Sequence, residues 1–140
     1  EIRNLYVKNN QYAGLFGFTV QAVVENIGVT GDVYGQYYTA GIVAKDIYTS
    51  ILNSYSKVNI HLEENSSTQY VGGIVGENNS ATISETYFRG IVKNGESVFG
   101  GIVGHNDGSQ YGSADIYDSY FYLTQTDART KTIKIKNCTT

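Results

Sequence analysis

The phrase Gly-Gly-Ile-Val-Gly at residues 72–76 decides the fold, because variants of it recur along the chain. It returns unchanged at 100–104, as Ala-Gly-Ile-Val-Ala at 40–44 and as Ala-Gly-Leu-Phe-Gly at 13–17. The second residue of every copy is glycine, and consecutive copies are 27, 32 and 28 residues apart. A phrase that repeats at roughly 20–50 residues is typical of repeat architectures. The sequence therefore indicates a scaffold before it indicates a catalyst.

A second block follows each glycine phrase and is best seen in Ile-Leu-Asn-Ser-Tyr at 51–55. Its leading aliphatic residue comes 10 residues after the phrase glycine in the first three units and 15 residues after it in the fourth. The extra residues fall among turn formers at 106–113, where stacked repeats tolerate insertions. Related blocks stand near both ends, at 2–7 and 135–139. We therefore interpret residues 1–140 as a single repeat segment, and expect it to be a piece of a longer repeat array.

The second block continues into a stretch with a period of two, which is the pattern of a strand with one buried and one solvated face. We expect the side chains that point inward to be Ser54, Ser56, Val58, Ile60 and Leu62. Those that point outward are expected to be Tyr55, Lys57, Asn59 and His61. The same register places Phe88 and Phe121 inward in the later units.

Equivalent positions in the blocks predict two rows of side chains. A row at a corner of the chain holds Asn4, Asn26, Asn53 and Asn137, with Glu85 and Asp118 in the remaining units. A small inward row holds Ile27, Ser54, Thr86, Ser119 and Cys138. Asparagine rows satisfy backbone groups at corners of stacked β structures.

A unit of this size cannot bury its apolar faces alone, whereas equivalent strands stacked in parallel can. We therefore predict an all-β protein: a parallel β-solenoid, or β-helix, with about four to five rungs of 27–33 residues. Two alternatives remain open at this stage. An antiparallel β-sandwich uses many short strands but needs no internal repetition, and a threefold β-barrel would require longer periods. The glycine phrase is expected to be a short apolar strand, and the sequence does not decide whether Ile74 or Val75 faces the core.

Composition excludes several classes of function. The net charge of −3 offers no basic field, so no nucleic-acid partner is expected. No apolar run is long enough to cross a bilayer, so no membrane insertion is expected. The single cysteine cannot form a disulfide within the chain.

Residues that could carry chemistry are scattered along the sequence. His61 is expected on an outer face and His105 in a turn, and neither has companions at metal-ligand spacing. The carboxylates at Glu63, Glu64 and Glu77 do not recur at equivalent rung positions, as a glycosidase pair would require. We therefore expect no catalytic residue, no metal and no cofactor, and hence a protein that is not an enzyme.

One outward row is a candidate for binding. Tyr6, Tyr55, Tyr87 and Tyr120 are expected at equivalent positions, with Lys57 and Arg89 two residues after two of them. Tyrosines with neighbouring cations form an amphipathic strip that can contact a sugar or a protein. The competing interpretation is that the rings only stabilise the sheet through cross-strand contacts.

The pairing of Gly-Gly-Ile-Val-Gly-x-Asn, at 72–78 and 100–106, with Ile-Lys-Asn-Cys at 135–138 resembles the GLUG repeat of bacterial secreted and surface proteins. That family includes segments of IgA-specific metallopeptidases and of adhesin-like proteins. The first two copies depart from it, because Phe16 replaces an aliphatic residue and Ala44 replaces the closing glycine. The resemblance implies export, an extracellular or bacterial cell-surface location and a β-solenoid scaffold without activity of its own.

These observations together predict a non-catalytic structural or adhesive repeat scaffold. The alternatives are a glycan- or protein-binding module that uses the tyrosine strip, and an accessory segment of a secreted peptidase. Expected partners are a host or cell-wall glycan or a surface protein. Uncapped solenoid ends would expose unpaired strand edges, so end-to-end self-association is also expected.

Overall fold

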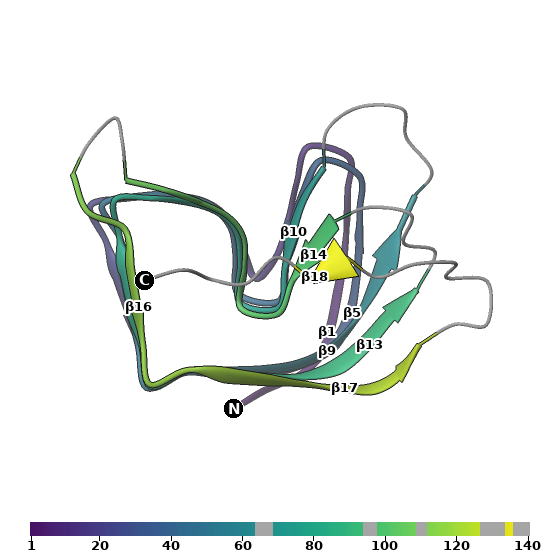
Figure 1. The fold of residues 1–140 in the computed structure, drawn as a ribbon. Helices are drawn as coiled ribbons and strands as arrows, with labels where there is room; N and C mark the ends of the chain where they lie inside the picture. The colour runs from purple at the N-terminus through teal and green to yellow at the C-terminus, as the bar shows by residue number, and fades with distance from the viewer. Residues whose placement is uncertain (64–68, 94–97, 109–111, 127–133, 136–140) are drawn as a thin grey trace.

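The computed structural model of the 140-residue chain describes residues 1–63, 69–93, 98–108, 112–126 and 134–135. Within these ranges the regular structure consists of β-strands. The backbone passes repeatedly through the same set of directions, and each pass lies on the one before it (Figure 1). The predicted parallel β-solenoid is confirmed.

Four parallel sheets form the walls of the described stack, and each turn contributes one strand to each wall. The long sheet contains β1 (Ile2–Asn9), β5 (Gly28–Gly35), β9 (Tyr55–Leu62), β13 (Tyr87–Lys93) and β17 (Tyr120–Thr126). The second sheet contains β2 (Tyr12–Ala13), β6 (Tyr38–Ala40), β10 (Tyr70–Gly72), β14 (Val98–Gly100) and β18 (Lys134–Ile135). The third contains β3 (Phe16–Val20), β7 (Val43–Ile47), β11 (Val75–Asn79) and β15 (Val103–Asp107), and the fourth contains β4 (Val23–Glu25), β8 (Ser50–Leu52), β12 (Thr82–Ser84) and β16 (Asp115–Tyr117).

The described residues form about three turns, slightly fewer than the four to five rungs predicted. Among the described residues, two sheets hold five strands and the other two hold four. The parallel pairing brings residues of one rung beside their equivalents in the next, as in the pairs of Val75 with Val43 and with Val103.

The alternation predicted for the long sheet is confirmed. Ser54, Ser56, Val58, Ile60 and Leu62 are buried, whereas Lys57 is exposed and Tyr55, Asn59 and His61 are half-buried. Phe88 is completely buried, and Phe121, its partner in the register, lies against Gly101 on the expected inward side although 36% of it is exposed. The core is therefore continuous along the coil and thins in the last turn.

The predicted corner row is confirmed for Asn26, Asn53, Glu85 and Asp118, but the place of Asn4 in it is wrong, because Asn4 lies inside β1, where irregular pairing puts it beside residues 29–31 of β5. Asn4, Asn26, Asn53, Glu85 and Asp118 all have positive φ, between 42° and 57°. This left-handed backbone is the region that asparagine and aspartate tolerate better than other non-glycine residues. The Asn53 amide nitrogen donates to the Asn26 side-chain oxygen at 2.6 Å, so neighbouring corners are also tied to each other. Asn137 and Cys138 lie outside the described residues.

The inward row of small residues also satisfies backbone groups, a role that the sequence had suggested only for the corner row. The Ser54 hydroxyl accepts the Ile27 backbone N–H at 3.2 Å and donates to the Leu52 carbonyl at 2.7 Å. Two units later, the Ser119 hydroxyl accepts the Thr86 backbone N–H at 3.3 Å. The row therefore hydrogen-bonds between turns inside a mainly apolar core.

The glycine phrase forms a bend rather than a straight strand, and both Ile74 and Val75 are completely buried. The bend presses on the long sheet: a Cβ on Gly73 would lie 2.4 Å from Phe88 Cγ and 2.3 Å from the Gly101 carbonyl oxygen. No side chain fits at Gly73, Gly41 or Gly101 without movement, which explains the glycine in these three copies, whereas at Gly14 the nearest atom to a Cβ would be 3.1 Å away.

The bend gives the cross-section an inner corner, which we define as the region where the second and third sheets face each other across the glycine phrase. In Figure 1 the chain descends along β10, turns, and rises again on the other side of the bend. The two walls approach closely, because a Cβ on Gly76 would lie 2.9 Å from the Tyr70 carbonyl oxygen.

Candidate functional site

Three of the predicted tyrosines form a continuous stack on the outer face of the long sheet. The Tyr55 and Tyr87 ring centroids are 5.0 Å apart with an interplanar angle of 9°, and those of Tyr87 and Tyr120 are 5.3 Å apart with an angle of 8°. The three residues are direct partners in the parallel register of β9, β13 and β17. The strip that the sequence predicts is therefore present over these three turns.

The predicted cations lie next to this stack. Lys57 Nζ lies 4.8 Å from the Tyr55 ring centroid and 5.8 Å from that of Tyr87. The Arg89 guanidinium carbon lies 6.0 Å from the Tyr122 ring centroid. These distances fall in the range of cation–π contacts, which contribute about 0.5–1 kcal/mol each at exposed sites.

Tyr6 does not join the strip, and its expected equivalence to Tyr55 is wrong. The register between β1 and β5 is irregular between Ile2 and Leu5, and it places Tyr6 opposite Asp32. The Tyr6 ring instead lies 5.4 Å from that of Tyr34. Opposite Tyr55, β5 carries Gly28, and a Cβ there would lie 2.2 Å from Tyr55 Cζ.

The stacking limits what the strip can offer to a ligand. Because the rings are nearly parallel and about one strand spacing apart, both faces of Tyr87 and one face of Tyr55 are turned toward neighbouring rings, and the other face of Tyr55 lies on the side of Gly28. Tyr120, which is 62% exposed, ends the described stack. A sugar that stacks on an aromatic face would therefore find its best platform at Tyr120, and edges and hydroxyls elsewhere.

A second tyrosine stack, which the sequence analysis missed, lines the inner corner. The ring centroids of Tyr12 and Tyr38 are 5.1 Å apart, and those of Tyr38 and Tyr70 are 5.4 Å apart. All three stand two or three residues before the conserved glycine of their phrase. This nearly constant offset could have indicated the stack, but it lies outside the two repeated blocks.

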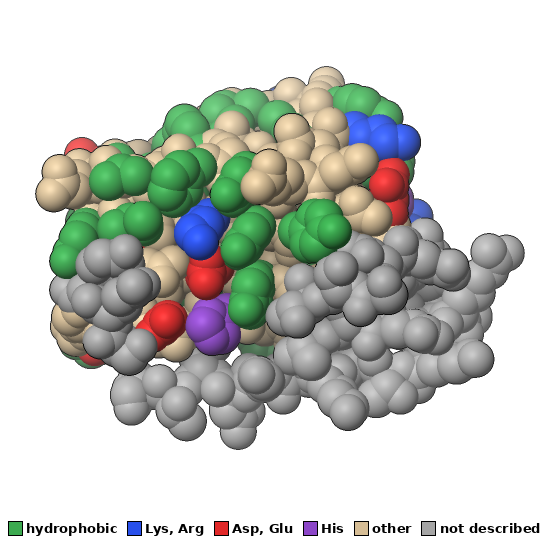
Figure 2. Space-filling view, turned by 90° about the horizontal axis from the view of Figure 1, so that it is seen from above, with side chains coloured by type: hydrophobic (Ala, Val, Ile, Leu, Met, Phe, Trp, Pro, Cys, Tyr) green, Lys and Arg blue, Asp and Glu red, His purple; other side chains and the backbone are tan. Residues whose placement is uncertain are grey.

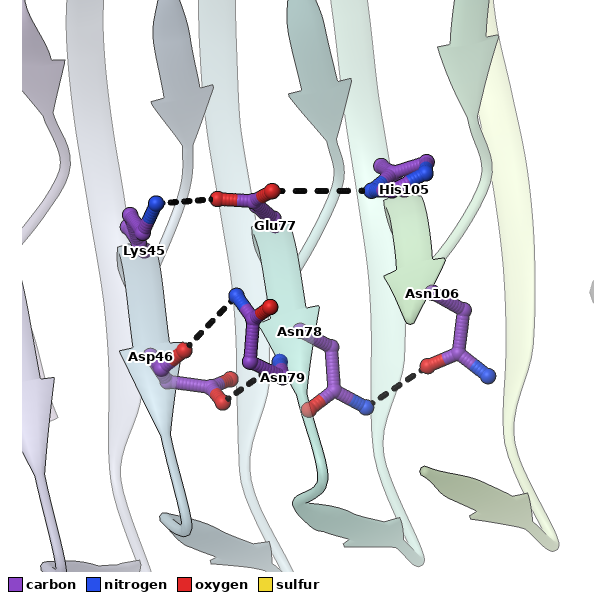
Figure 3. Close-up of polar contacts among 7 residues, drawn as sticks. All are labelled: Lys45, Asp46, Glu77, Asn78, Asn79, His105 and Asn106. Carbon is purple, nitrogen blue, oxygen red and sulfur yellow. Dashed lines mark hydrogen bonds and ion pairs between the residues drawn. The ribbon is translucent and has the colours of Figure 1, made fainter. Parts of the chain in front are cut away.

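The facing wall of the inner corner carries a charged row across three turns. Lys45 Nζ lies 2.6 Å from Glu77 Oε2, and Glu77 Oε1 lies 3.6 Å from His105 Nδ1 (Figure 3). In the view from above, basic, acidic and histidine side chains lie in a line with hydrophobic side chains beside them (Figure 2). The tyrosine stack contacts this row: Lys45 Nζ is 4.9 Å from the Tyr38 centroid, and the Tyr70 and His105 rings are 4.8 Å apart.

The electrostatics of this row hold Lys45 charged. Partial burial lowers the pKa of Lys45, but the contact with the Glu77 carboxylate and its negative charge outweigh burial, so that the pKa is raised overall. Burial, followed by the charge of Glu77, also raises the pKa of Tyr38. The lysine is therefore a fixed cation and the tyrosine a neutral phenol, and neither is prepared to act as a base.

Of the two histidines, His61 lies where the sequence predicts and His105 does not. His105 lies within strand β15 and not in a turn, because the register that pairs Val75 with Val103 continues through Glu77 and His105. His61 lies on the outer face as expected. Its Nε2 is 2.8 Å from Asp32 Oδ1, and its ring stacks on Tyr34 with centroids 4.1 Å apart. The hydrogen bond with His61 is the main reason why the pKa of Asp32 is lowered.

A buried polar row runs behind the charged row at the next positions of the same strands (Figure 3). The Asn78 amide donates to Asn106 Oδ1 at 2.7 Å, and Asn78 Oδ1 accepts the Ala81 backbone N–H at 3.0 Å. Asp46 occupies the equivalent position in β7, is completely buried, and accepts the Asn79 backbone N–H at 3.2 Å. Burial raises the pKa of Asp46 to about 7.

Neither row has the composition of a metal centre. Within the described ranges, no group of three histidine, cysteine or carboxylate side chains is arranged to hold a metal ion. The same residues contain no helix that is long and apolar enough to cross a membrane.

Comparison with family models, with curated proteins and with solved structures gave no match for this chain.

Proposed function

We propose that this chain is a non-catalytic structural repeat scaffold of a bacterial secreted or cell-surface protein. The observation that carries the proposal is the orientation of the repeated aromatic side chains. The rings that recur from turn to turn stack on one another, as Tyr55 does on Tyr87 and Tyr38 on Tyr70. The contacts between stacked rings are therefore enough to explain why tyrosine recurs at these positions from turn to turn. The extracellular setting rests on the resemblance of the glycine phrase to the GLUG repeat.

The charged groups support the same proposal. Lys45 and Glu77 neutralise each other, and Asp32 and His61 are hydrogen-bonded to each other. These candidate acids and bases are therefore paired with one another within the scaffold. An accessory segment of a secreted peptidase would be a scaffold of this kind, with the catalytic residues elsewhere in its parent.

A stability measurement tests the scaffold proposal. Tyr87→Ala removes two ring contacts, each worth about 0.5–1.5 kcal/mol, so we expect the free energy of unfolding to fall by about 1–3 kcal/mol. Tyr122→Ala, at an exposed ring of the last described turn, is the matched control and should cost less. Equal stability of the Tyr87→Ala variant and the wild type in urea denaturation would contradict a structural role for the stack.

The second candidate function is a glycan- or protein-binding module. It is favoured by Lys57 and Arg89 beside the rings and by the exposed Tyr120 at the end of the stack. Screening the folded chain on a glycan array, followed by titration of Tyr55→Ala, Tyr87→Ala and Tyr120→Ala, tests it. A bound glycan whose affinity falls most in Tyr120→Ala would support this function. Unchanged affinity in all three variants would exclude the strip as the site.

A further inference from the structure

Cationic side chains concentrate on one wall of the coil, although the net charge of the chain is −3. The lysine and arginine side chains that the structure describes on the long sheet are Arg3, Lys8, Lys57, Arg89 and Lys93, and Lys45 is the one described elsewhere. Asp32 is the single carboxylate on the described strands of this sheet, and it is already hydrogen-bonded to His61 and Asn59. The long sheet is therefore a locally basic surface on an acidic chain.

Two of these cations stand opposite each other on adjacent turns. Lys57 and Arg89 each follow a member of the Tyr55–Tyr87 pair by two residues, so the parallel register of β9 and β13 places them side by side. Both side chains are exposed, and neither forms an ion pair within the described part of the chain. Like charges directly opposite each other destabilise a sheet. Water weakens this repulsion at an exposed face, so the fold tolerates the pair, but the packing does not require it.

The inner corner shows how the chain arranges charges that serve the scaffold alone. There Glu77 stands between Lys45 and His105, with oxygen atoms 2.6 Å and 3.6 Å from their nitrogen atoms. The row that contains Lys57 and Arg89 lacks such an intervening carboxylate within the described turns. An anion that binds from outside would supply the missing negative charge.

Aromatic rings hold both cations in place without neutralising them. Lys57 Nζ lies 4.8 Å from the Tyr55 ring centroid, and the Arg89 guanidinium carbon lies 6.0 Å from that of Tyr122. A ring attracts a cation through its quadrupole and carries no net charge. The two cations are therefore partly ordered before an anion binds, which lowers the entropic cost of binding.

The surroundings of the two cations favour a sugar polymer over a protein as the partner. None of the large hydrophobic side chains found exposed in the described structure lies on β5, β9 or β13. The core of a protein interface is apolar and depleted in lysine, which does not fit this wall. Tyrosine edges and hydroxyls suit a hydroxyl-rich ligand. Because equivalent groups recur at each strand spacing, a partner whose own groups repeat can contact successive turns.

We propose that the row formed by Lys57 and Arg89, with the tyrosine edges beside it, binds a linear polysaccharide that carries carboxylates and lies across the strands. This inference rests on the second candidate function, binding at the tyrosine strip, and names the class of ligand. The planar Arg89 guanidinium can hold a carboxylate through paired hydrogen bonds, and Lys57 adds a point charge beside it. One cation on each of two turns suits a polymer with a single charge on each sugar better than a densely sulfated one.

Isothermal titration calorimetry with oligogalacturonate and with hyaluronan fragments tests the proposal. The methyl esters of the same oligosaccharides are the probes that lack the charge. We expect the acid forms alone to bind, with an affinity that falls as the salt concentration rises. The variant Lys57→Gln/Arg89→Gln keeps long polar side chains without the charges and should lose affinity by roughly tenfold or more.

Lys8→Gln is the matched control on the same sheet. Lys8 Nζ is already paired with Glu63 Oε1 at 3.3 Å, so this variant should bind the acidic oligosaccharides like the wild type. Circular dichroism and thermal melting establish that each variant is folded. Lys57→Gln alone replaces the double variant if that chain does not fold.

The possible results separate this inference from the function on which it rests. Equal affinity for the acid and the methyl ester, lowered for both in Tyr87→Ala, would retain a binding function and overturn the acidic class of ligand. Tighter binding of heparin or of polyglutamate would assign the row to a sulfated polymer or to an acidic protein, and would also overturn it. Unchanged affinity of the double variant would exclude these two cations as the site. Binding of none of the probes at low salt would overturn both proposals.

Discussion

Replacing Asp46 by asparagine should stabilise the protein, and most strongly at alkaline pH. Asp46 is completely buried, and its one carboxylate contact with the backbone is the N–H of Asn79 at 3.2 Å. Burial raises the pKa of Asp46 from 3.8 to about 7, and the negative charge of Glu77 adds to the increase. Asparagine keeps the acceptor oxygen and places an amide where the second carboxylate oxygen lies. It therefore retains the shape without the buried charge.

The sign follows from proton binding in the two states. Between pH 3.8 and about 7 the folded state holds a proton on Asp46 that the unfolded chain has lost, so stability falls as pH rises through this window. The shift is about three pKa units, and each unit corresponds to about 1.4 kcal/mol, which gives a penalty of about 4 kcal/mol above pH 7. The Asp46→Asn variant should escape this penalty and match the wild type near pH 4.

Urea denaturation at intervals between pH 4 and 8 measures this difference directly. Asp32→Asn is the control of opposite sign: the hydrogen bond with His61 lowers the pKa of Asp32, so its ionised form stabilises the fold above pH 3.8. That variant should be less stable than the wild type at pH 7, and the difference should disappear as pH falls through the folded-state pKa. If Asp46→Asn is no more stable than the wild type at pH 8, the buried carboxylate is not the source of the penalty.

Three further substitutions test other contacts. Gly73→Ala would bring a Cβ to 2.4 Å from Phe88 Cγ, and we expect the free energy of unfolding to fall by about 1–3 kcal/mol in urea denaturation, with partial recovery on adding Phe88→Leu. Asn53→Val places a β-branched residue at a φ of 42° and should lower the thermal midpoint, at a cost of about 1–3 kcal/mol, more than Asn53→Gly does. Lys45→Met leaves the buried Glu77 carboxylate without its cation and should cost about 2–4 kcal/mol, most of which a second change, Glu77→Gln, should restore in a double-mutant cycle.

The sequence predicted the coil because three independent periodicities agree. Glycine at the bend, alternation in the long sheet and a left-handed residue at the corner each require a particular residue type at every turn. Phe88 occupies the inward position and Asn53 the corner position that the sequence predicted, whereas the bend at Gly73 and the left-handed backbone of Asn53 are findings of the structure. In a stacked structure these constraints are local to one turn, so one chain supplies several aligned observations of the same rule.

The shape of the cross-section could not be predicted in the same way. Whether the glycine phrase forms a strand or a bend depends on contacts between opposite walls, which a one-dimensional period does not contain. The inner corner, and with it the Tyr38 and Tyr70 stack, follows from that bend. The prediction for Tyr6 was wrong for a different reason. The pairing of β1 with β5 is irregular, so Tyr6 does not lie at the position equivalent to Tyr55. Among the described strands, β1 has a neighbour on one side only.

The charged row shows how stacking restricts the residues that can carry function. Side chains at equivalent positions lie about one strand spacing apart, roughly 5 Å, and two like charges at that distance repel by about 3 kcal/mol at an effective dielectric constant of 20. Lys45, Glu77 and His105 avoid this cost because the acidic residue stands between the two basic ones. At the solvent-exposed corner, where water screens the charges, Glu85 and Asp118 can follow Asn53 without such alternation. A buried pair of like charges on adjacent turns would therefore be the feature that scaffold packing cannot explain. Within the described residues the closest approach to it is Asp46 with Glu77, where the raised pKa lets Asp46 hold its proton.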